Sequence, residues 1–142
     1  MSGEGNANGG RIIPALRYRN AAAAIDWLCQ AFGFERKMVV PADGGRVAHA
    51  ELTLGNGMIM LGDVETEYGR IVAAPTRGGP ATQGIYVVVE DADAHYARAK
   101  AAGAEIVLDI KTQDYGGRDY TARDPEGHVW TFGTYDPWVA TA

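Results

Sequence analysis

The sequence predicts an α+β fold built from two βαβββ modules, the first over residues 11–63 and the second over residues 83–136. Three observations predict it. Each half carries one helical pattern among short alternating segments that are typical of strands. Nineteen glycines among 142 residues indicate many turns and strand ends. Helix caps, helix-ending glycines and turn glycines recur at an offset of 70 or 71 residues, which indicates an internal duplication.

The first module begins with a strand expected over residues 11–18. A helix follows, capped by Asn20 and ended by Gly33. Its apolar face is formed by residues at helical spacing, namely Ile25, Leu28, Cys29 and Phe32. Three strands are expected next, over 34–40, 46–54 and 58–63, and the turn Gly55-Asn56-Gly57 joins the last two.

The second module repeats this order. A β-branched strand over 84–90 leads to a helix that is capped by Asp91 and ended by Gly103. Strands are then expected over 105–111, 118–123 and 128–135. Residues 64–82 are expected to be a linker because they are rich in Gly and Pro, and residues 1–10 a disordered tail. Residues 11–142 are thus expected to form a single domain.

Charge and composition exclude several classes of function. The chain has 18 acidic and 13 basic residues, a net charge of −5 and no basic run, so no nucleic-acid or anionic membrane partner is expected. The single cysteine, Cys29, excludes an intrachain disulfide. No apolar run approaches the roughly 18 residues that span a bilayer, and the N-terminus lacks a signal-peptide pattern. A cytoplasmic location is therefore expected.

A four-stranded sheet with one helix leaves its other face bare. Two such modules can place their bare faces around a central cavity, as a cupped mixed sheet with the helices outside. Strand alternation projects a largely apolar lining into this cavity, which suits a neutral or aromatic small molecule. The projected residues are Ile13, Ala15, Arg17, Ile59, Leu61, Asp63, Gly84, Tyr86, Val88, Glu90, Val129, Thr131, Gly133 and Tyr135.

Four segments resemble the vicinal oxygen chelate superfamily, also called glyoxalase/bleomycin resistance protein/dioxygenase. They are PALRYRNAAAAIDWLCQAFGFE (14–35), VAHAELTLGNGMIMLGD (47–63), VEDADAHYARAKAAGAEI (89–106) and YGGRDYTARDPEGHVWTFGTYDPW (115–138). The resemblance implies the two-module fold and a homodimer. It does not fix the function, because this family includes metal-dependent lyases, isomerases and dioxygenases as well as metal-free drug-binding resistance proteins.

The resemblance also implies where a metal would be held, on the first and last strands of each module. The matching positions are Ile13, Leu61, Gly84 and Thr131. These side chains do not offer the roughly three N, O or S ligands of a catalytic metal site. No metal cofactor is therefore expected at these positions.

His49 and Glu51 stand two apart on a predicted strand and therefore point to the same side. With Asp63 nearby, they could form a displaced metal or acid–base site. The alternative interpretation is a polar strand face with an ion pair. His95 is expected at the surface, whereas His128 is expected to pack under the second helix.

The ligand-binding candidates come from both modules, and Arg118 and Tyr120 are expected at the cavity rim. The full set is Arg17, His49, Glu51, Leu61, Tyr86, Arg118, Tyr120 and Thr131. One hypothesis is a metal-free binder of a small apolar or aromatic molecule, of the resistance or sequestration type. The alternatives are an enzyme of the lyase, isomerase or dioxygenase type that uses His49 and Glu51, and a regulatory interaction module.

Overall fold

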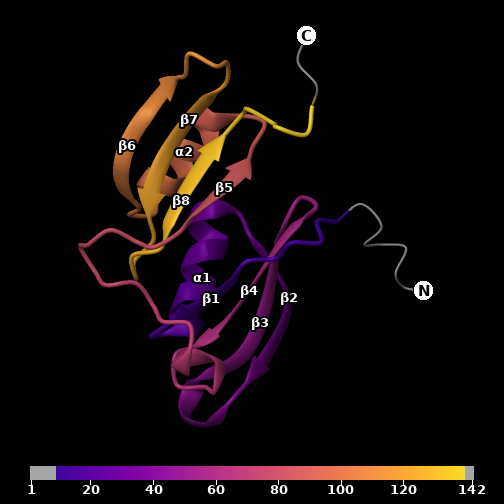
Figure 1. Ribbon diagram of the computed structural model, residues 1–142, viewed down its shortest axis with the longest axis vertical. Coiled ribbons are helices and arrows are strands. Elements are labelled where there is room, and N and C mark those ends of the chain that lie inside the picture. Colours follow the sequence, from indigo (N-terminus) through magenta and orange to yellow (C-terminus); the bar gives the residue numbers. More distant parts are fainter. Residues whose placement is uncertain (1–8, 140–142) are drawn as a thin grey trace. The chain divides into compact units, whose positions relative to one another are not determined.

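The computed structural model describes residues 9–139. The chain divides into two compact units, Met1–Ala74 and Pro75–Ala142. Each unit holds one α-helix and one four-stranded mixed sheet, which confirms the predicted α+β fold of two βαβββ modules (Figure 1). The predicted tail lies outside the described residues, apart from its last two positions. The single-domain organisation of residues 11–142 stays a prediction.

The first unit contains β1 (Ala15–Tyr18), α1 (Ala21–Phe32), β2 (Glu35–Pro41), β3 (Val47–Leu54) and β4 (Gly57–Asp63). Its sheet has the order β1-β4-β3-β2, with β1 parallel to β4 and the other pairs antiparallel. Two 3₁₀ turns, η2 (Asp43–Gly45) and η3 (Tyr68–Arg70), complete the unit. The first strand begins four residues later than predicted, because Pro14 has no N–H to donate to the sheet. The Pro14 carbonyl still accepts a hydrogen bond from the Met60 N–H at 2.9 Å.

The second unit repeats the arrangement with β5 (Gly84–Val88), α2 (Ala92–Ala101), β6 (Glu105–Thr112), β7 (Arg118–Arg123) and β8 (Val129–Gly133). The sheet order is β5-β8-β7-β6, and β5 is parallel to β8. Neither of the two α-helices found between residues 9 and 139 is long and apolar enough to cross a membrane.

The helix ends lie close to where the sequence predicts them. The Asn20 side chain accepts a hydrogen bond from the Ala23 N–H at 3.1 Å, and Asp91 accepts one from the Ala94 N–H at 3.0 Å. These carboxyl and amide oxygens satisfy N–H groups that have no partner within the helix. Gly33 ends α1 with a φ of 87°, a left-handed conformation that glycine adopts without strain.

Each sheet has a helix face, which packs against the helix of its own unit, and a far face on the opposite side. The helix face of the first sheet contributes the fully buried Tyr18, Leu52 and Leu61, which pack with apolar residues of α1. The helix face of the second sheet contributes Tyr120, Ala122, Trp130 and Phe132. Burial of these side chains supplies the main stabilisation of each unit.

The turn before β8 is fastened to this core through Asp124. One carboxylate oxygen of Asp124 accepts from the backbone N–H groups of Glu126 and His128, at 3.0 and 3.1 Å. The other oxygen accepts from the indole N–H of the buried Trp130, at 3.1 Å. The Asp-Pro-Glu-Gly-His segment is therefore a structural turn in this chain.

Candidate functional site

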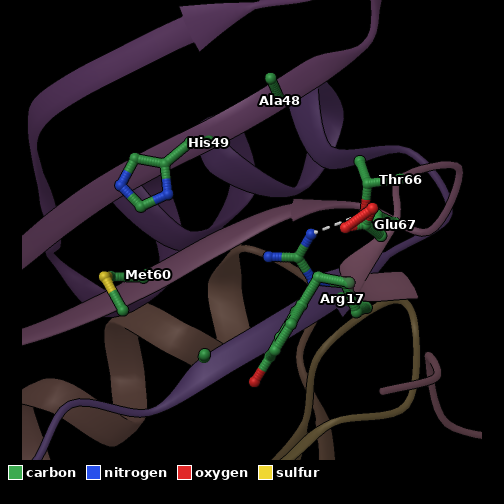
Figure 2. A pocket seen from close by; sticks show the side chains of 8 residues that line it. Arg17, Ala48, His49, Met60, Thr66 and Glu67 are labelled. Carbon is green, nitrogen blue, oxygen red and sulfur yellow. Dashed lines mark hydrogen bonds between the residues drawn. The ribbon is translucent and has the colours of Figure 1, made fainter. Parts of the chain in front are cut away.

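A hollow of about 490 Å³ lies on the far face of the first sheet (Figure 2). It is bounded by β1, β3 and β4 and by the segment that follows β4. The lining combines small, apolar and aromatic side chains with a few polar groups: Ala15, Arg17, Ala48, His49, Met60, Thr66, Glu67 and Tyr68. A mostly apolar hollow with a few polar groups is typical of a small-molecule site.

A β-bulge in β3 places two consecutive residues at this hollow. Val40 pairs with His49 and Pro41 pairs with Val47, so Ala48 has no partner on β2. Val47 and Ala50 are buried, whereas Ala48 and His49 both line the hollow. A bulge of this kind changes the side to which a side chain points. Without it, regular alternation would send Ala48 and His49 to opposite faces.

Arg17 forms one wall of the hollow and is only 5% exposed. Its guanidinium donates to the carbonyl of Leu16 at 2.9 Å and to the carbonyl of Asp63 and the hydroxyl of Thr66, each at 3.3 Å. The guanidinium carbon lies 5.0 Å from the centre of the Tyr68 ring. Burial lowers the pKa of Arg17, while Tyr68 and Asp63 act in the opposite direction. The group remains a fixed positive charge.

Gly62 makes room for this arginine. A Cβ at position 62 would lie 2.7 Å from the carbonyl oxygen of Ala48 and 2.8 Å from a guanidinium nitrogen of Arg17. Both distances are shorter than ordinary contacts, so a larger residue would displace the arginine or the neighbouring strand. The glycine therefore determines how Arg17 lies in the hollow.

His49 and Glu51 point to the same side of β3, as predicted, and their side chains touch. Nε2 of His49 lies 2.9 Å from a carboxylate oxygen of Glu51, and the side chains are 36% and 20% exposed. A histidine held by a carboxylate can accept or donate a proton. The pair is thus able to serve acid–base chemistry at the edge of the hollow.

The predicted third member of that group, Asp63, does not join it. Asp63 is buried, and its two carboxylate oxygens accept from the backbone N–H groups of Ala21 and Val47, at 3.3 and 2.6 Å. It fastens α1 and β3 to the end of β4. Asp63 is therefore not part of a displaced site, which is reduced to the pair His49 and Glu51. Residues 9–139 contain no group of three His, Cys, Asp or Glu side chains that could hold a metal ion.

The strand registers correct the position predicted on β4. Ala15 pairs with Met60 in the first sheet, and Tyr86 pairs with Thr131 in the second, so Thr131 corresponds to Met60 at an offset of 71. The expected residue, Leu61, is fully buried on the helix face. The error has a physical cause, because the turn between β7 and β8 is one residue longer than the turn between β3 and β4. Equivalent residues of the two modules are therefore 70 apart in β3 and β7 but 71 apart in β4 and β8.

The corrected set of metal positions implied by the family resemblance is Ile13, Met60, Gly84 and Thr131. These positions supply an aliphatic group, a thioether, a hydrogen atom and a hydroxyl. Catalytic divalent metals are held by imidazole, carboxylate or thiolate groups, so these four residues do not fit the metal that the family resemblance implies.

In the second unit, both predicted rim residues lie on the helix face. Tyr120 is fully buried, and its hydroxyl lies 2.6 Å from Nδ1 of His95 in α2. Arg118 donates through Nε and a terminal nitrogen to the carboxylate of Asp93 in α2, and this hydrogen bonding raises the pKa of Arg118. The predicted rim positions of both residues are wrong, because their alternation in β7 directs them toward α2.

His95 is also placed differently from the prediction. Its ring stacks on Phe132, with 4.1 Å between ring centroids, and is half-buried rather than at the surface. Tyr86 and Thr131 lie on the far face, as projected. The Thr131 hydroxyl is 2.7 Å from that of Thr121, and the Tyr86 hydroxyl donates to the carbonyl of Tyr135 at 2.7 Å.

Sequence reasoning missed Met60, Ala48 and the contribution of the linker. Thr66, Glu67 and Tyr68 belong to the segment 64–82, which was expected to be a linker and from which no site residue was named. An aromatic residue soon after a strand, in a long connection, was the available signal for a binding segment. Nothing in the sequence indicated the bulge that brings Ala48 to the hollow.

Comparison with known proteins places this chain in a family. The sequence model of the Glyoxalase/Bleomycin resistance protein/Dioxygenase superfamily matches residues 12–132. An uncharacterized protein of Mycobacterium bovis is 36% identical over 123 residues, which cover 86% of this chain and 81% of that protein.

Solved structures agree with this result. TioX from Micromonospora sp. ML1 is similar with a TM-score of 0.72 and 35% identity, over 88% of this chain and 98% of that chain. The fosfomycin resistance protein FosX from Mesorhizobium loti shares the fold, with a TM-score of 0.63 and 14% identity over 91% and 94% of the two chains. The extent of the sequence match and the two βαβββ units lead to one conclusion: the chain belongs to the glyoxalase/bleomycin resistance protein/dioxygenase superfamily.

Proposed function

We propose that this chain binds a small, largely apolar or aromatic molecule in the hollow of its first unit, without a resident divalent metal. The observation that carries the proposal is the lining itself. Ala15, Ala48, Met60 and Tyr68 offer apolar and aromatic surface, and Arg17 and His49 offer polar contacts at its edge. Burial of an apolar ligand against such a surface favours binding by roughly 25 cal/mol per Å² removed from water.

The residue types at the four family metal positions support the metal-free part of the proposal. Ile13, Met60, Gly84 and Thr131 present no imidazole and no carboxylate. Met60 instead adds a flexible thioether to the hollow, and methionine adapts well to ligands of different shape. The family to which the chain belongs includes bleomycin resistance proteins, so a resistance or sequestration role is part of this proposal.

A fluorescent aromatic probe tests the hollow directly. N-phenyl-1-naphthylamine is neutral and apolar, and its emission rises when it leaves water. We expect saturable binding to the full chain, reduced at least about tenfold by Ala48→Phe, because the new ring would fill the hollow. Ala101→Phe, at an exposed position of α2, is the matched control and should leave binding unchanged. Equal binding to both variants would overturn the proposal.

The contact between His49 and Glu51 supports a second candidate, a family enzyme that uses the pair in acid–base chemistry at the same hollow. His49→Gln separates the two candidates once a ligand is known. A binder should keep its affinity and show no turnover in either form. An enzyme should keep affinity in the variant but lose about 10² to 10⁴ in turnover, which is the usual contribution of a positioned acid or base.

A homodimer also belongs to this proposal, because the family resemblance implies one. Sedimentation equilibrium of the full chain tests it. A mass twice the 15.1 kDa of one chain would support the dimer, and a single 15.1 kDa species at micromolar concentration would reject it.

A further inference from the structure

The far face of the second sheet carries three tyrosines around a buried carboxylate. We call Tyr86, Tyr115, Asp119 and Tyr135 the tyrosine–aspartate patch. Asp119 is only 8% exposed, whereas all three tyrosines are exposed, with Tyr115 at 60%. The patch belongs entirely to the second unit, and the hollow in the first unit does not include any of its residues.

Asp119 is held by neutral donors. One carboxylate oxygen accepts from the side-chain amide of Gln113 at 2.8 Å, and the other accepts from the hydroxyl of Tyr115 at 2.8 Å. Over the part of the chain from residue 9 to residue 139, neither a lysine nor an arginine forms an ion pair with it. Burial of a carboxylate without a cationic partner is costly, and each oxygen can still accept a further hydrogen bond.

The aromatic rings are held close to this carboxylate. The rings of Tyr115 and Tyr135 pack edge to face, with centroids 5.4 Å apart. The hydroxyl of Tyr86 donates to the backbone carbonyl of Tyr135 at 2.7 Å. Gly133 permits the approach, because a Cβ there would lie 2.5 Å from the Tyr86 hydroxyl and 2.8 Å from Cβ of Asp119.

The charge of Asp119 also affects the phenols around it. Burial, and then the negative charge of Asp119, raise the pKa of Tyr86. The hydrogen bond to Asp119 raises the pKa of Tyr115. Both phenols therefore stay neutral near pH 7, where their rings present the negative faces that attract cations.

We propose that the tyrosine–aspartate patch binds an organic ammonium group, either a quaternary ammonium or a protonated amine. The carboxylate supplies the opposite charge, and the phenol rings supply cation–π contacts to the apolar surface of the ammonium. A metal ion is a poor fit because Asp119 is the one carboxylate of the patch and no set of three ligands surrounds it. Tyr86 and Tyr135 are among the residues that the sequence projects into a ligand cavity, and this site adds to the proposed function a second ligand class, bound by the unit that does not hold the hollow.

Choline and 3,3-dimethylbutan-1-ol form a matched pair of probes, because they share a shape and differ in the positive charge. We expect choline to shift the amide NMR signals around Gly117, Asp119 and Gly133 of the full chain in a saturable way, in the millimolar range that small cation–π sites support. The neutral alcohol should bind at least about tenfold more weakly. Equal binding of the two probes would overturn the proposal. Guanidinium chloride is the control for a general cation effect, and the proposal would also fail if it shifted the same amide signals as saturably as choline does.

Two pairs of variants give the test its specificity. Asp119→Asn should weaken choline binding at least about tenfold and leave the alcohol unaffected, whereas Asp114→Asn removes the same charge from an exposed neighbour and should change little. Tyr115→Phe keeps the ring and should retain most of the binding, while Tyr115→Leu should lose it. Because Tyr115 is exposed, its variants test the site even where Asp119→Asn fails to fold.

An equal loss in Asp114→Asn and Asp119→Asn, or equal binding by the two Tyr115 variants, would reject the ammonium site. N-phenyl-1-naphthylamine binding in the first unit should not respond to any of these substitutions. The two proposals can therefore fail independently.

Discussion

At the scale of single residues, Tyr120 shows how a side chain predicted for a ligand site serves the core instead. It is fully buried beneath α2, with its hydroxyl 2.6 Å from Nδ1 of His95, and its ring stacks with that of Phe132 at 5.5 Å. Alternation along β7 places Tyr120 on the same side as Ala122, which is also buried. The sequence contains this alternation, but it does not say which of the two sides meets the helix.

The buried phenol predicts a loss of stability at high pH. Desolvation raises the pKa of Tyr120, so the folded state keeps its proton at a pH where the unfolded chain, with a tyrosine pKa near 10, releases it. The stabilisation is complete below pH 10 and is lost as the pH rises above it. We expect the free energy of unfolding to fall by up to about 1.4 kcal/mol per pH unit from this group.

Urea denaturation of Tyr120→Phe between pH 7 and pH 11 measures this effect. The variant should be about 1 kcal/mol less stable than the wild type at pH 7, because the contact with His95 is lost, but its alkaline decline should be shallower. Tyr68→Phe, at an exposed ring, should follow the wild-type curve. Parallel alkaline declines in stability for the wild type and Tyr120→Phe would show that the raised pKa of Tyr120 is not the cause of the decline.

At the scale of elements, helix ends could be predicted from the sequence and strand irregularities could not. Asn20, Gly33 and Asp91 act through local hydrogen bonds and backbone preferences, which neighbouring residues determine. The bulge at Ala48 and His49 depends instead on how β2 pairs with β3 across the sheet. No glycine or proline marks it in β3, so single-sequence patterns contain no signal for it.

Any side chain larger than hydrogen at position 62 of β4 is expected to disturb the packing of the hollow. In Gly62→Ala the new methyl group would meet the Ala48 carbonyl at 2.7 Å and the Arg17 guanidinium at 2.8 Å. We expect a loss of about 1–3 kcal/mol in the free energy of unfolding and weaker N-phenyl-1-naphthylamine binding. Urea denaturation and fluorescence titration measure the two effects.

The matched control for this variant is Gly84→Ala, in the first strand of the other sheet. A Cβ at position 84 would find its nearest atom at 3.8 Å, an ordinary contact. The control should stay within about 0.5 kcal/mol of the wild type. If Gly62→Ala were as stable as Gly84→Ala and bound the probe equally well, the tight approach of Arg17 to β4 would be refuted.

At the scale of the whole molecule, the duplication was the feature that predicted most of the fold. The recurring caps and turn glycines predicted two βαβββ modules, and each unit has the expected order of elements. The site was predicted less well. Arg17, His49, Glu51, Tyr86 and Thr131 lie on the far faces, but Leu61, Arg118 and Tyr120 lie on the helix faces. Their positions depend on the side of each strand that meets its helix, which tertiary packing decides.

The metal-ligating side chains of the chain lead us to expect that divalent metals do not change its thermal stability. Residues 9–139 offer no cluster of three His, Cys, Asp or Glu side chains, and no family metal position carries such a group. We expect the melting temperature to change by less than about 1 °C with excess EDTA, Zn²⁺ or Ni²⁺, because a ligand stabilises only a state that binds it. A rise of several degrees, or stoichiometric metal after desalting, would contradict the metal-free proposal.

The extra residue in the turn between β7 and β8 shows where the length of a module can change without a change in strand pairing. The two modules differ in length by one residue at this hairpin tip, while the strand pairs on either side keep equivalent partners. The far faces of the two sheets carry different side chains, an arginine and a histidine in the first unit and tyrosines and an aspartate in the second. A residue added at such a tip leaves the strand registers intact, whereas a residue added within a strand changes which side chains share a face, as the bulge at Ala48 shows.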